Sequence, residues 1–348
     1  MDNAPSLRLD RVHIRGLRGI ERLDLPEEGM GWEGRSPPVA MLGGANGSGK
    51  TTLLRCIAAA ASQLGSGGVG GPSEHLGAAE CRLDFSIRDA HGELLSFNFV
   101  VGEEAFVASV EAESSFGFRG PPNGRKWYAN GGVKELVRTL SEPALFARSS
   151  LPRVVFFPSD TRELVLPSER QFHPAQLRED AGFVAWWNRS LGTSWKGSTM
   201  ELLSAARWAD LNAKENNRPD DAVNFEAYSR AFSEFTAGKK RLGWTNRGEL
   251  QVFLTDGSSH NLDELSAGER QIVLLLAELR RYWRPCSLIL IDEPELHLHD
   301  AWQGRLYETI VGMQRELGGQ VILTTQSHSL FAMADEGTCA LLGRSPLR

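Results

Sequence analysis

The segment from Gly44 to Thr51 reads Gly-Ala-Asn-Gly-Ser-Gly-Lys-Thr and has the residue types of a loop that binds phosphate. Glycines let the backbone wrap phosphate oxygens with its N–H groups, and a helix N-terminus adds positive potential. Lys50 should reach the β- and γ-phosphates of a nucleotide, and the Thr51 hydroxyl should ligate Mg²⁺. A glycine-rich turn that matches by chance is the alternative. The expected nucleotide contacts are Gly44, Asn46, Gly47, Ser48, Gly49, Lys50, Thr51 and Thr52.

Two carboxylates follow an apolar run near the other end of the chain. Residues 287–291 read as a buried strand, and Asp292 and Glu293 come directly after it. Open α/β sheets place their ligand chemistry at the carboxyl ends of their strands. Asp292 there suits the water shell of Mg²⁺, and Glu293 suits a catalytic base that polarises the water attacking a γ-phosphate. A strand that simply ends in solvated acids is the alternative.

His297 and His299 lie just beyond these carboxylates and, with Asp300, could belong to a zinc site. No third and fourth ligand of suitable spacing is evident in the sequence. Asp300 is also well placed to cap a helix over residues 301–317. Helix capping is therefore favoured over zinc.

A second helix start with anion-binding character lies more than two hundred residues after the first. Residues 265–270 read LSAGER and lead into a long apolar helix. The Ser266 hydroxyl and the N–H groups near Gly268 suit an anion at a helix N-terminus. Alternatively, Ser266 is an ordinary N-cap and Glu269 completes a capping box, which is compatible with the first interpretation.

Apolar and alternating patterns predict the elements that hold these motifs. Residues 7–25 read as two strands around a glycine turn, residues 81–101 as a hairpin, and residues 105–112 as a further strand. Helical patterns dominate from about residue 166 to about residue 240, including residues 178–191. Buried strands are predicted at 37–42, 153–158, 287–291 and 320–325, and a helix at 49–64.

Together the motifs GANGSGKTT, LSAGER and LILIDEPELHLH resemble those of the ABC-type ATPases of the RecF, SMC and OLD group. The opening RVHIRGLRGIERLDL is similar to the hairpin that begins these proteins, so the resemblance covers roughly residues 7–60 and 250–335. It implies an α/β P-loop NTPase fold of ABC-ATPase type, with a mixed central sheet, an antiparallel β subdomain and a helical insertion. We expect an ATPase lobe in 1–165, the insertion in 166–245, and a second ATPase lobe in 246–348.

In this group the signature LSAGER serves a neighbouring protomer. The resemblance implies an ATP-dependent homodimer or higher oligomer in which Ser266 and Gly268 of one protomer contact the γ-phosphate held by the other. ATP and Mg²⁺ are the implied ligands. Family members sense the γ-phosphate with a residue after the next strand, usually histidine. Gln326 occupies that place here and His328 follows two residues later, so the switch residue stays open between them.

The composition, with 41% hydrophobic and 24% charged residues, is that of an ordinary soluble protein. No apolar run is long enough to span a membrane and no leader pattern opens the chain. The cysteines are scattered without metal spacing, and three of the four sit in apolar context, which is typical of buried thiols in a reducing compartment. We therefore expect a cytoplasmic protein with no membrane partner. The cysteines are Cys56, Cys81, Cys286 and Cys339.

The net charge of −6 argues against a surface that is basic throughout. Two segments, Arg119–Tyr128 and Lys239–Arg247, combine basic residues with Trp127 and Trp244 and could contact DNA by stacking and charge. Solvated loops with the tryptophan packed inward are the alternative. No acidic cluster of the Toprim type and no long coiled coil is evident, so we expect any effector, such as a nuclease, to be a separate protein.

The leading hypothesis is an ATPase that dimerises head to tail on ATP and uses hydrolysis to switch a partner acting on DNA. By analogy with the group, the process would be bacterial anti-phage defence or DNA repair. One alternative is the ATP-binding subunit of a transporter, against which the DEPELHLH segment and the large helical insert stand. Another is an ATP-gated scaffold with little turnover, against which Glu293 stands as a catalytic base.

Overall fold

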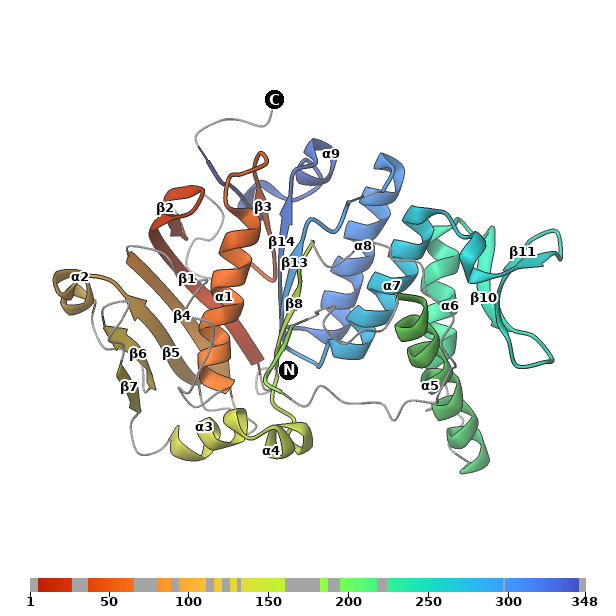
Figure 1. Cartoon of the computed structure of the whole chain (residues 1–348), viewed down its shortest axis with the longest axis horizontal. Coiled ribbons are helices and arrows are strands. Elements are labelled where there is room, and N and C mark those ends of the chain that lie inside the picture. The colour runs from red at the N-terminus through yellow and green to blue at the C-terminus, as the bar shows by residue number, and fades with distance from the viewer. Residues whose placement is uncertain are drawn as a thin grey trace.

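A parallel sheet of six strands forms the centre of the protein (Figure 1). The structure, a computed structural model, describes residues 6–26, 37–65, 80–88, 94–110, 116–120, 126–129, 133–159, 182–186, 195–217, 224–296 and 298–343. The sheet order is β15 (Cys339–Leu341), β3 (Val39–Gly43), β14 (Gln320–Thr325), β13 (Leu288–Asp292), β8 (Val154–Phe157) and β9 (Val184–Trp186). Every neighbouring pair in it runs parallel.

A second six-stranded sheet is antiparallel except between β5 and β6. Its order is β2 (Ile20–Leu25), β1 (Ser6–Leu17), β4 (Glu80–Arg88), β5 (Leu94–Val101), β6 (Phe116–Gly120) and β7 (Lys126–Ala129). The helix α1 (Lys50–Gly65) lies between the two sheets (Figure 1). The predicted α/β class is confirmed: the neighbouring strands of the central sheet all run parallel, whereas the second sheet combines antiparallel pairs with one parallel pair.

The central sheet is buried on both faces, as parallel sheets require. Leu288 and Leu290 point into a core shared with α1 and the antiparallel sheet, whereas Ile289 and Ile291 point into the opposite core. That opposite core contains the long helices of the second half of the chain. These are α5 (Trp195–Glu215), α6 (Asn224–Phe235), α7 (Ala267–Tyr282) and α8 (Asp300–Leu317).

Smaller elements complete the described part of the chain. The strands β10 (Lys240–Trp244), β11 (Leu250–Leu254) and β12 (Ser259–His260) form a small antiparallel sheet beyond α6 (Figure 1). The short helices are α2 (Glu104–Ser109), α3 (Lys134–Ser141), α4 (Pro143–Arg148) and α9 (His328–Phe331), with 3₁₀ turns at Leu262–Glu264 and Glu336–Thr338.

Two local predictions are wrong where they fall on described residues. The expected strand at 105–112 is instead α2, because the Phe106 side chain packs on Gly102 and stacks on His13. The expected helix at 178–191 is instead β9, which extends the edge of the central sheet by pairing with β8. In both cases tertiary contacts override a weak local preference.

The division into segments at 165/166 and 245/246 stays a prediction. The segment predicted as a helical insertion carries α5 and α6, and also β9 of the central sheet and β10, which pairs with β11. None of the described helices is long and apolar enough to cross a membrane. Among the cysteines, Cys56 and Cys81 are buried, and Cys286 and Cys339 are partly exposed.

Candidate nucleotide site

The loop Gly44–Gly49 joins the end of β3 to the start of α1, as predicted. Gly47 and Gly49 have φ values of 83° and 91°, in the region that favours glycine. A Cβ on Gly44 would collide with the Ser48 hydroxyl oxygen and would lie 2.8 Å from the Leu342 carbonyl oxygen. The loop therefore closes tightly at its base, while Ala45, Asn46 and Gly47 are exposed at its tip.

Lys50 is buried, with 4% of its side chain exposed. Its Nζ donates to the carbonyl oxygens of Gly44 at 2.8 Å and Ala45 at 3.1 Å. It also lies 3.2 Å from Glu293 Oε1, which brings two of the four predicted catalytic residues, Lys50 and Glu293, into one ion pair. A buried ammonium held by carbonyl oxygens and one carboxylate is preorganised to receive the more strongly charged oxygens of a polyphosphate.

Asp292 is completely buried at the end of β13. Its Oδ2 accepts hydrogen bonds from the Thr51 hydroxyl at 2.7 Å and the Ser159 hydroxyl at 2.5 Å, and its Oδ1 accepts from the Thr324 hydroxyl at 2.6 Å. Thr51 and Asp292, predicted as the magnesium residues, are therefore in direct contact. Ser159 was not predicted; its position directly after the buried strand at 153–158 was the available signal.

Glu293 adopts an unusual backbone conformation for a residue with a side chain. Its φ is 43°, and its N–H is held by the carbonyl and hydroxyl oxygens of Thr324, each at 3.1 Å. Left-handed non-glycine residues cost free energy and persist only where surrounding contacts impose them. Here they turn the carboxylate toward Lys50, with 13% of the side chain still exposed to solvent.

The residues present fit a magnesium–nucleotide complex. The Thr51 hydroxyl and the Asp292 carboxylate supply the hard oxygen atoms that Mg²⁺ prefers. The hydroxyl oxygen of Ser48 is buried and has no hydrogen-bond partner in the described part of the chain, as expected for a donor reserved for a phosphate. The loop, Lys50 and the Thr51–Asp292 pair meet at the carboxyl edge of the central sheet.

The switch region is pinned by a carboxylate that the sequence analysis did not single out. Glu295 Oε1 accepts from the Thr325 hydroxyl at 2.5 Å and from the Gln326 N–H at 3.0 Å. Burial raises the pKa of Glu295, and these hydrogen bonds only partly oppose that rise. Ser327 next to them donates to Gln303 Oε1 on α8 at 2.5 Å. Gln326 is thus fixed beside β13, whereas His328 is exposed at the start of α9.

The signature segment begins α7 with the capping box that was one of its two interpretations. The Glu269 N–H donates to the Ser266 hydroxyl at 3.3 Å, and the Ser266 N–H donates to Glu269 Oε2 at 2.9 Å. Burial alone would raise the pKa of Glu269, but bonds from Lys240 and Ser266 hold it below its usual value. Glu269 is therefore turned inward against Lys240, 2.8 Å away, whereas Ser266 is exposed and Gly268 is partly exposed.

The helices that follow the phosphate loop and the signature segment pack on opposite faces of the central sheet. The helix α1 after Gly49 packs in the core shared with the antiparallel sheet. The helix α7 after Ser266 packs in the other core.

Of the two histidines considered for a zinc site, only His299 lies within the described residues, and His297 lies outside them. His299 caps α8, and its Nδ1 accepts from the Ala301 N–H at 3.3 Å. The cap was predicted at Asp300, which is instead the first helical residue and accepts from Gln303 at 3.3 Å. A capping imidazole satisfies the same N–H group, so the cap moves by one residue. Across the described ranges, no three His, Cys, Asp or Glu side chains are grouped as a metal site.

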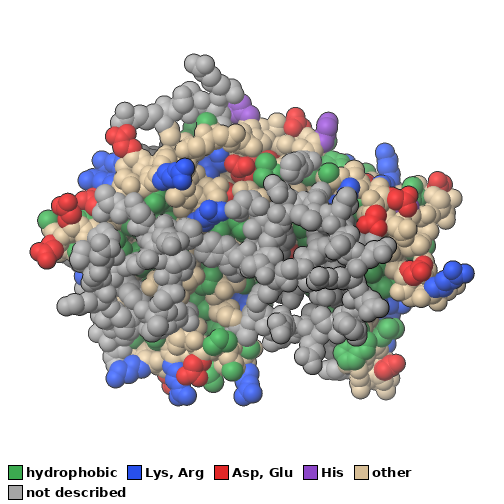
Figure 2. Space-filling view, viewed as in Figure 1, with side chains coloured by type: hydrophobic (Ala, Val, Ile, Leu, Met, Phe, Trp, Pro, Cys, Tyr) green, Lys and Arg blue, Asp and Glu red, His purple; other side chains and the backbone are tan. Residues whose placement is uncertain are grey.

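The predicted basic–aromatic segments differ from each other. The Trp244 ring packs at 5.7 Å from the Phe225 ring, which favours inward packing over base stacking. The residues Arg119 and Lys126 lie on the paired strands β6 and β7, and the Trp127 side chain lies outside the described part. Over the described surface viewed in Figure 2, acidic and basic side chains are interspersed.

The turn between β1 and β2 supports the phosphate loop from the antiparallel sheet. A Cβ on Gly19, which has φ 83°, would lie 2.6 Å from the Gly47 carbonyl oxygen and 2.7 Å from the Gly49 N atom. A Cβ on Gly49 would in turn lie 2.6 Å from Ile20 Cγ1. The backbone of the hairpin at Gly19 therefore packs directly on the backbone of the loop at Gly47 and Gly49, and the space between them has no room for a side chain.

This fold and site define a P-loop ATPase fold of the ABC type. The chain belongs to the family described as "AAA domain, putative AbiEii toxin, Type IV TA system", whose model matches residues 39–332. No curated protein matches the chain.

Among solved structures, the chain is similar to an SMC head bound to the C-winged helix domain of ScpA. The identity is 17%, the coverage is 94% of this chain and 92% of that one, and the TM-score is 0.51, which supports the fold. The SMC head domain of Thermotoga maritima matches at 14% identity, 94% and 92% coverage and a TM-score of 0.46. An SMC head from Pyrococcus furiosus, bound to the C-terminal domain of ScpA, matches at 15%, with 95% and 92% coverage and a TM-score of 0.44.

The contact between hairpin and loop predicts that Gly19→Ala weakens nucleotide binding. A side chain that meets backbone costs about 1–3 kcal/mol, and 1.4 kcal/mol is a tenfold change in affinity. We expect affinity for a fluorescent ATP analogue to fall by about tenfold or more. Gly248→Ala is the matched control, because Gly248 has φ 77° but open space around its Cβ. Equal affinities of the two variants, with similar urea denaturation curves, would contradict the contact's role.

Proposed function

We propose that this protein hydrolyses ATP at the site formed by the phosphate loop and the end of β13. The observation that carries the proposal is the pair of contacts Lys50–Glu293 and Thr51–Asp292, which join the two motifs across the edge of the sheet. Mg²⁺, when bound, would neutralise phosphate charge and orient the transferred group. Within the site, Thr51 and Asp292 hold the metal and its water, and Lys50 holds the β- and γ-phosphates.

Glu293 is the proposed catalytic base. A base must lie within reach of the attacking water and must be able to accept its proton. Glu293 is partly exposed to solvent and is paired with Lys50, so a phosphate that takes over Lys50 leaves the carboxylate available for water. Gln326 is the proposed γ-phosphate sensor, because its backbone is fixed by Glu295 beside the same strand end.

The exposed Ser266 supports a composite site between two protomers. Its N–H and its hydroxyl oxygen both take part in the capping box, but the hydroxyl can still donate, and Ser266 and Ala267 are exposed at the first turn of α7. A helix start of this kind attracts anions. A head-to-tail homodimer would place Ser266 and Gly268 of one protomer at the γ-phosphate of the other, so that ATP joins the protomers and hydrolysis releases them.

The proposed role is an ATP-driven switch in the cytoplasm that controls a separate effector, such as a nuclease, acting on DNA. The family description names a toxin of a toxin–antitoxin system, which favours a defence role over DNA repair. The SMC head to which the chain is similar at a TM-score of 0.51 is described bound to the C-winged helix domain of ScpA, which supports a partner protein docked on a fold of this kind.

The first prediction from the proposed function concerns the rate of ATP hydrolysis. Glu293→Gln keeps the shape of the site but removes the base, so phosphate release should fall by roughly 100-fold or more while ATP binding persists. Lys50→Ala should lose both binding and release. Steady-state phosphate release and binding of a fluorescent ATP analogue measure the two effects. Glu316→Gln, on the exposed surface of α8, is the control. Unchanged phosphate release in both site variants would contradict the ATPase proposal and favour an ATP-gated scaffold.

The second prediction tests the composite site by mixing variants. Lys50→Ala and Ser266→Arg should each be inactive alone. Mixed dimers would rebuild one intact site from the loop of one protomer and the signature of the other, so an equal mixture should recover about a quarter of the wild-type rate. Lys50→Ala mixed with Glu293→Gln is the control and should stay inactive, because both changes act on the same half-site. Recovery in neither mixture contradicts the head-to-tail arrangement.

The third prediction separates the two candidate switch residues. Gln326→Ala should lower phosphate release by about tenfold or more, as loss of a hydrogen bond to a charged group costs about 1.5–3 kcal/mol. His328→Ala should retain release, because His328 is exposed at the start of α9. Phosphate release at saturating ATP measures both. The opposite ranking would assign the switch to His328.

A further inference from the structure

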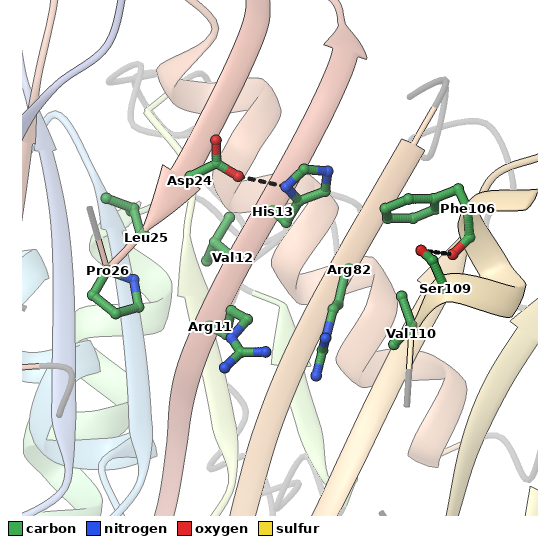
Figure 3. A pocket seen from close by; sticks show the side chains of 10 residues that line it. All are labelled: Arg11, Val12, His13, Asp24, Leu25, Pro26, Arg82, Phe106, Ser109 and Val110. Atoms are coloured by element: carbon green, nitrogen blue, oxygen red, sulfur yellow. Dashed lines mark hydrogen bonds and ion pairs between the residues drawn. The ribbon is translucent and has the colours of Figure 1, made fainter. Parts of the chain in front are cut away.

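A hollow of about 420 Å³ lies on the antiparallel sheet, away from the nucleotide site (Figure 3). Strands β1, β2 and β4 form its floor and α2 forms one wall. Arg11, His13, Asp24, Arg82 and Phe106 are among its lining residues. Its size falls within the range of small-ligand sites.

The hollow opens on the face of the sheet opposite to α1. Along β4, Cys81 and Leu83 are buried in the core shared with α1. Side chains alternate across a strand, so Arg82 and Asp84 point to the other face. The phosphate loop at the start of α1 and the hollow are therefore separated by the thickness of the sheet.

One wall of the hollow is held rigidly. His13 Nδ1 lies 2.5 Å from Asp24 Oδ1, and the His13 ring stacks on Phe106 with centroids 5.2 Å apart and planes at 24°. Although burial alone would raise the pKa of Asp24, hydrogen bonds from Arg22 and His13 hold it below its usual value. Asp24 is therefore a charged carboxylate whose oxygen atoms already contact His13 and Arg22, and it holds His13 in place.

Two guanidinium groups share one carboxylate at the floor. Arg82 binds Asp84 closely through Nε, at 2.8 and 3.0 Å from the two oxygens, and through Nη2 at 2.8 Å. Arg11 reaches the same carboxylate only at 3.7 Å, and 51% of its side chain is exposed. Asn98 also donates to Asp84, at 2.7 Å. Arg11 is therefore the more exposed and the more weakly paired of the two guanidinium groups.

The three strands around the hollow carry slightly more arginines than acids, although the whole chain carries a net charge of −6. On this face the cross-strand pairs place Arg15 beside Arg22 and Glu80, His13 beside Asp24 and Arg82, and Arg8 beside Ser86. The arginines on β1, β2 and β4 are Arg8, Arg11, Arg15, Arg22, Arg82 and Arg88, and the acids on the same strands are Asp10, Glu21, Asp24, Glu80 and Asp84. An excess of arginine over carboxylate gives a local positive potential that attracts anions.

We propose that this hollow binds a phosphate-bearing ligand, with Arg11 and Arg82 holding the phosphate. Planar guanidinium forks match the geometry of phosphate oxygens, which favours an anionic ligand over a cationic one. Phe106, Pro26 and Val110 provide an apolar surface for the sugar or base next to it. The same chemistry is presented by a nucleic-acid backbone and by a free nucleotide. The proposal does not depend on hydrolysis at the phosphate loop.

The test compares Arg11→Gln with Arg138→Gln in the full chain without ATP. Arg138, with 68% of its side chain exposed on α3, is the matched control. One probe is a fluorescein-labelled single-stranded oligodeoxynucleotide, followed by anisotropy at several salt concentrations. The other is AMP, followed by calorimetry in a Lys50→Ala background that weakens the phosphate loop. We expect Arg11→Gln to lose about tenfold in affinity for the ligand, and about one unit of salt slope if that ligand is the oligonucleotide.

The outcomes distinguish the ligand sources and separate this proposal from the ATPase. An Arg11-dependent loss for the oligonucleotide identifies a nucleic-acid backbone, and an Arg11-dependent loss for AMP alone identifies a free nucleotide. Equal binding by the two arginine variants with both probes, or no binding by the wild type, overturns the proposal. ATP hydrolysis by Arg11→Gln should equal that of the wild type, so failure of the hollow and failure of the nucleotide site give different results.

Discussion

The buried carboxylate of Asp292 is the constraint on which the nucleotide site depends. A charge removed from water is costly unless it is hydrogen-bonded, and hydroxyl groups from three other segments meet this need. Thr51 comes from the start of α1, Thr324 from β14, and Ser159 from the loop after β8. Hydrogen bonds to charged groups contribute about 1.5–3 kcal/mol each, so the same contacts that hold the sheet edge together also order the oxygen atoms suited to Mg²⁺.

The central sheet separates the two helix starts for which anion binding is proposed. Because it is buried on both faces, α1 and α7 pack in different cores. The phosphate loop is complete at its base, with Lys50 already surrounded by carbonyl and carboxylate oxygens. The exposed start of α7 has no such enclosure. A site that is closed on one side and a helix start that is open on the other are complementary surfaces, which is the physical basis for proposing a composite site between protomers.

The sequence was sufficient where function depends on short contiguous segments. The loop Gly44–Thr51, the acids after β13 and the capping box at Ser266 are local patterns, and the structure shows the strand, loop and helix contexts that they predict. It was insufficient where a role depends on residues distant in the chain. Ser159 meets Asp292 across 133 positions and Gln303 meets Ser327 across 24. Periodicity also failed for α2 and β9, because packing on His13 and pairing with β8 decided their conformations.

Strand β1 links the two sites on this chain. Its outer face contributes Arg11 and His13 to the hollow, and its end leads into the Gly19 turn that touches the phosphate loop. The strand is also tied to the central sheet, since Leu9 N–H donates to Gln320 at 2.8 Å and Leu7 N–H to Cys286 at 3.0 Å. A ligand couples two sites only if it binds their alternative arrangements with different affinities. These two hydrogen bonds hold β1 in place against the central sheet. A ligand in the hollow would therefore change the affinity for ATP only if it shifted the turn at Gly19 relative to Gly47. If β1 does not move, the two sites bind their ligands independently, and the hollow serves only to bind its phosphate-bearing ligand.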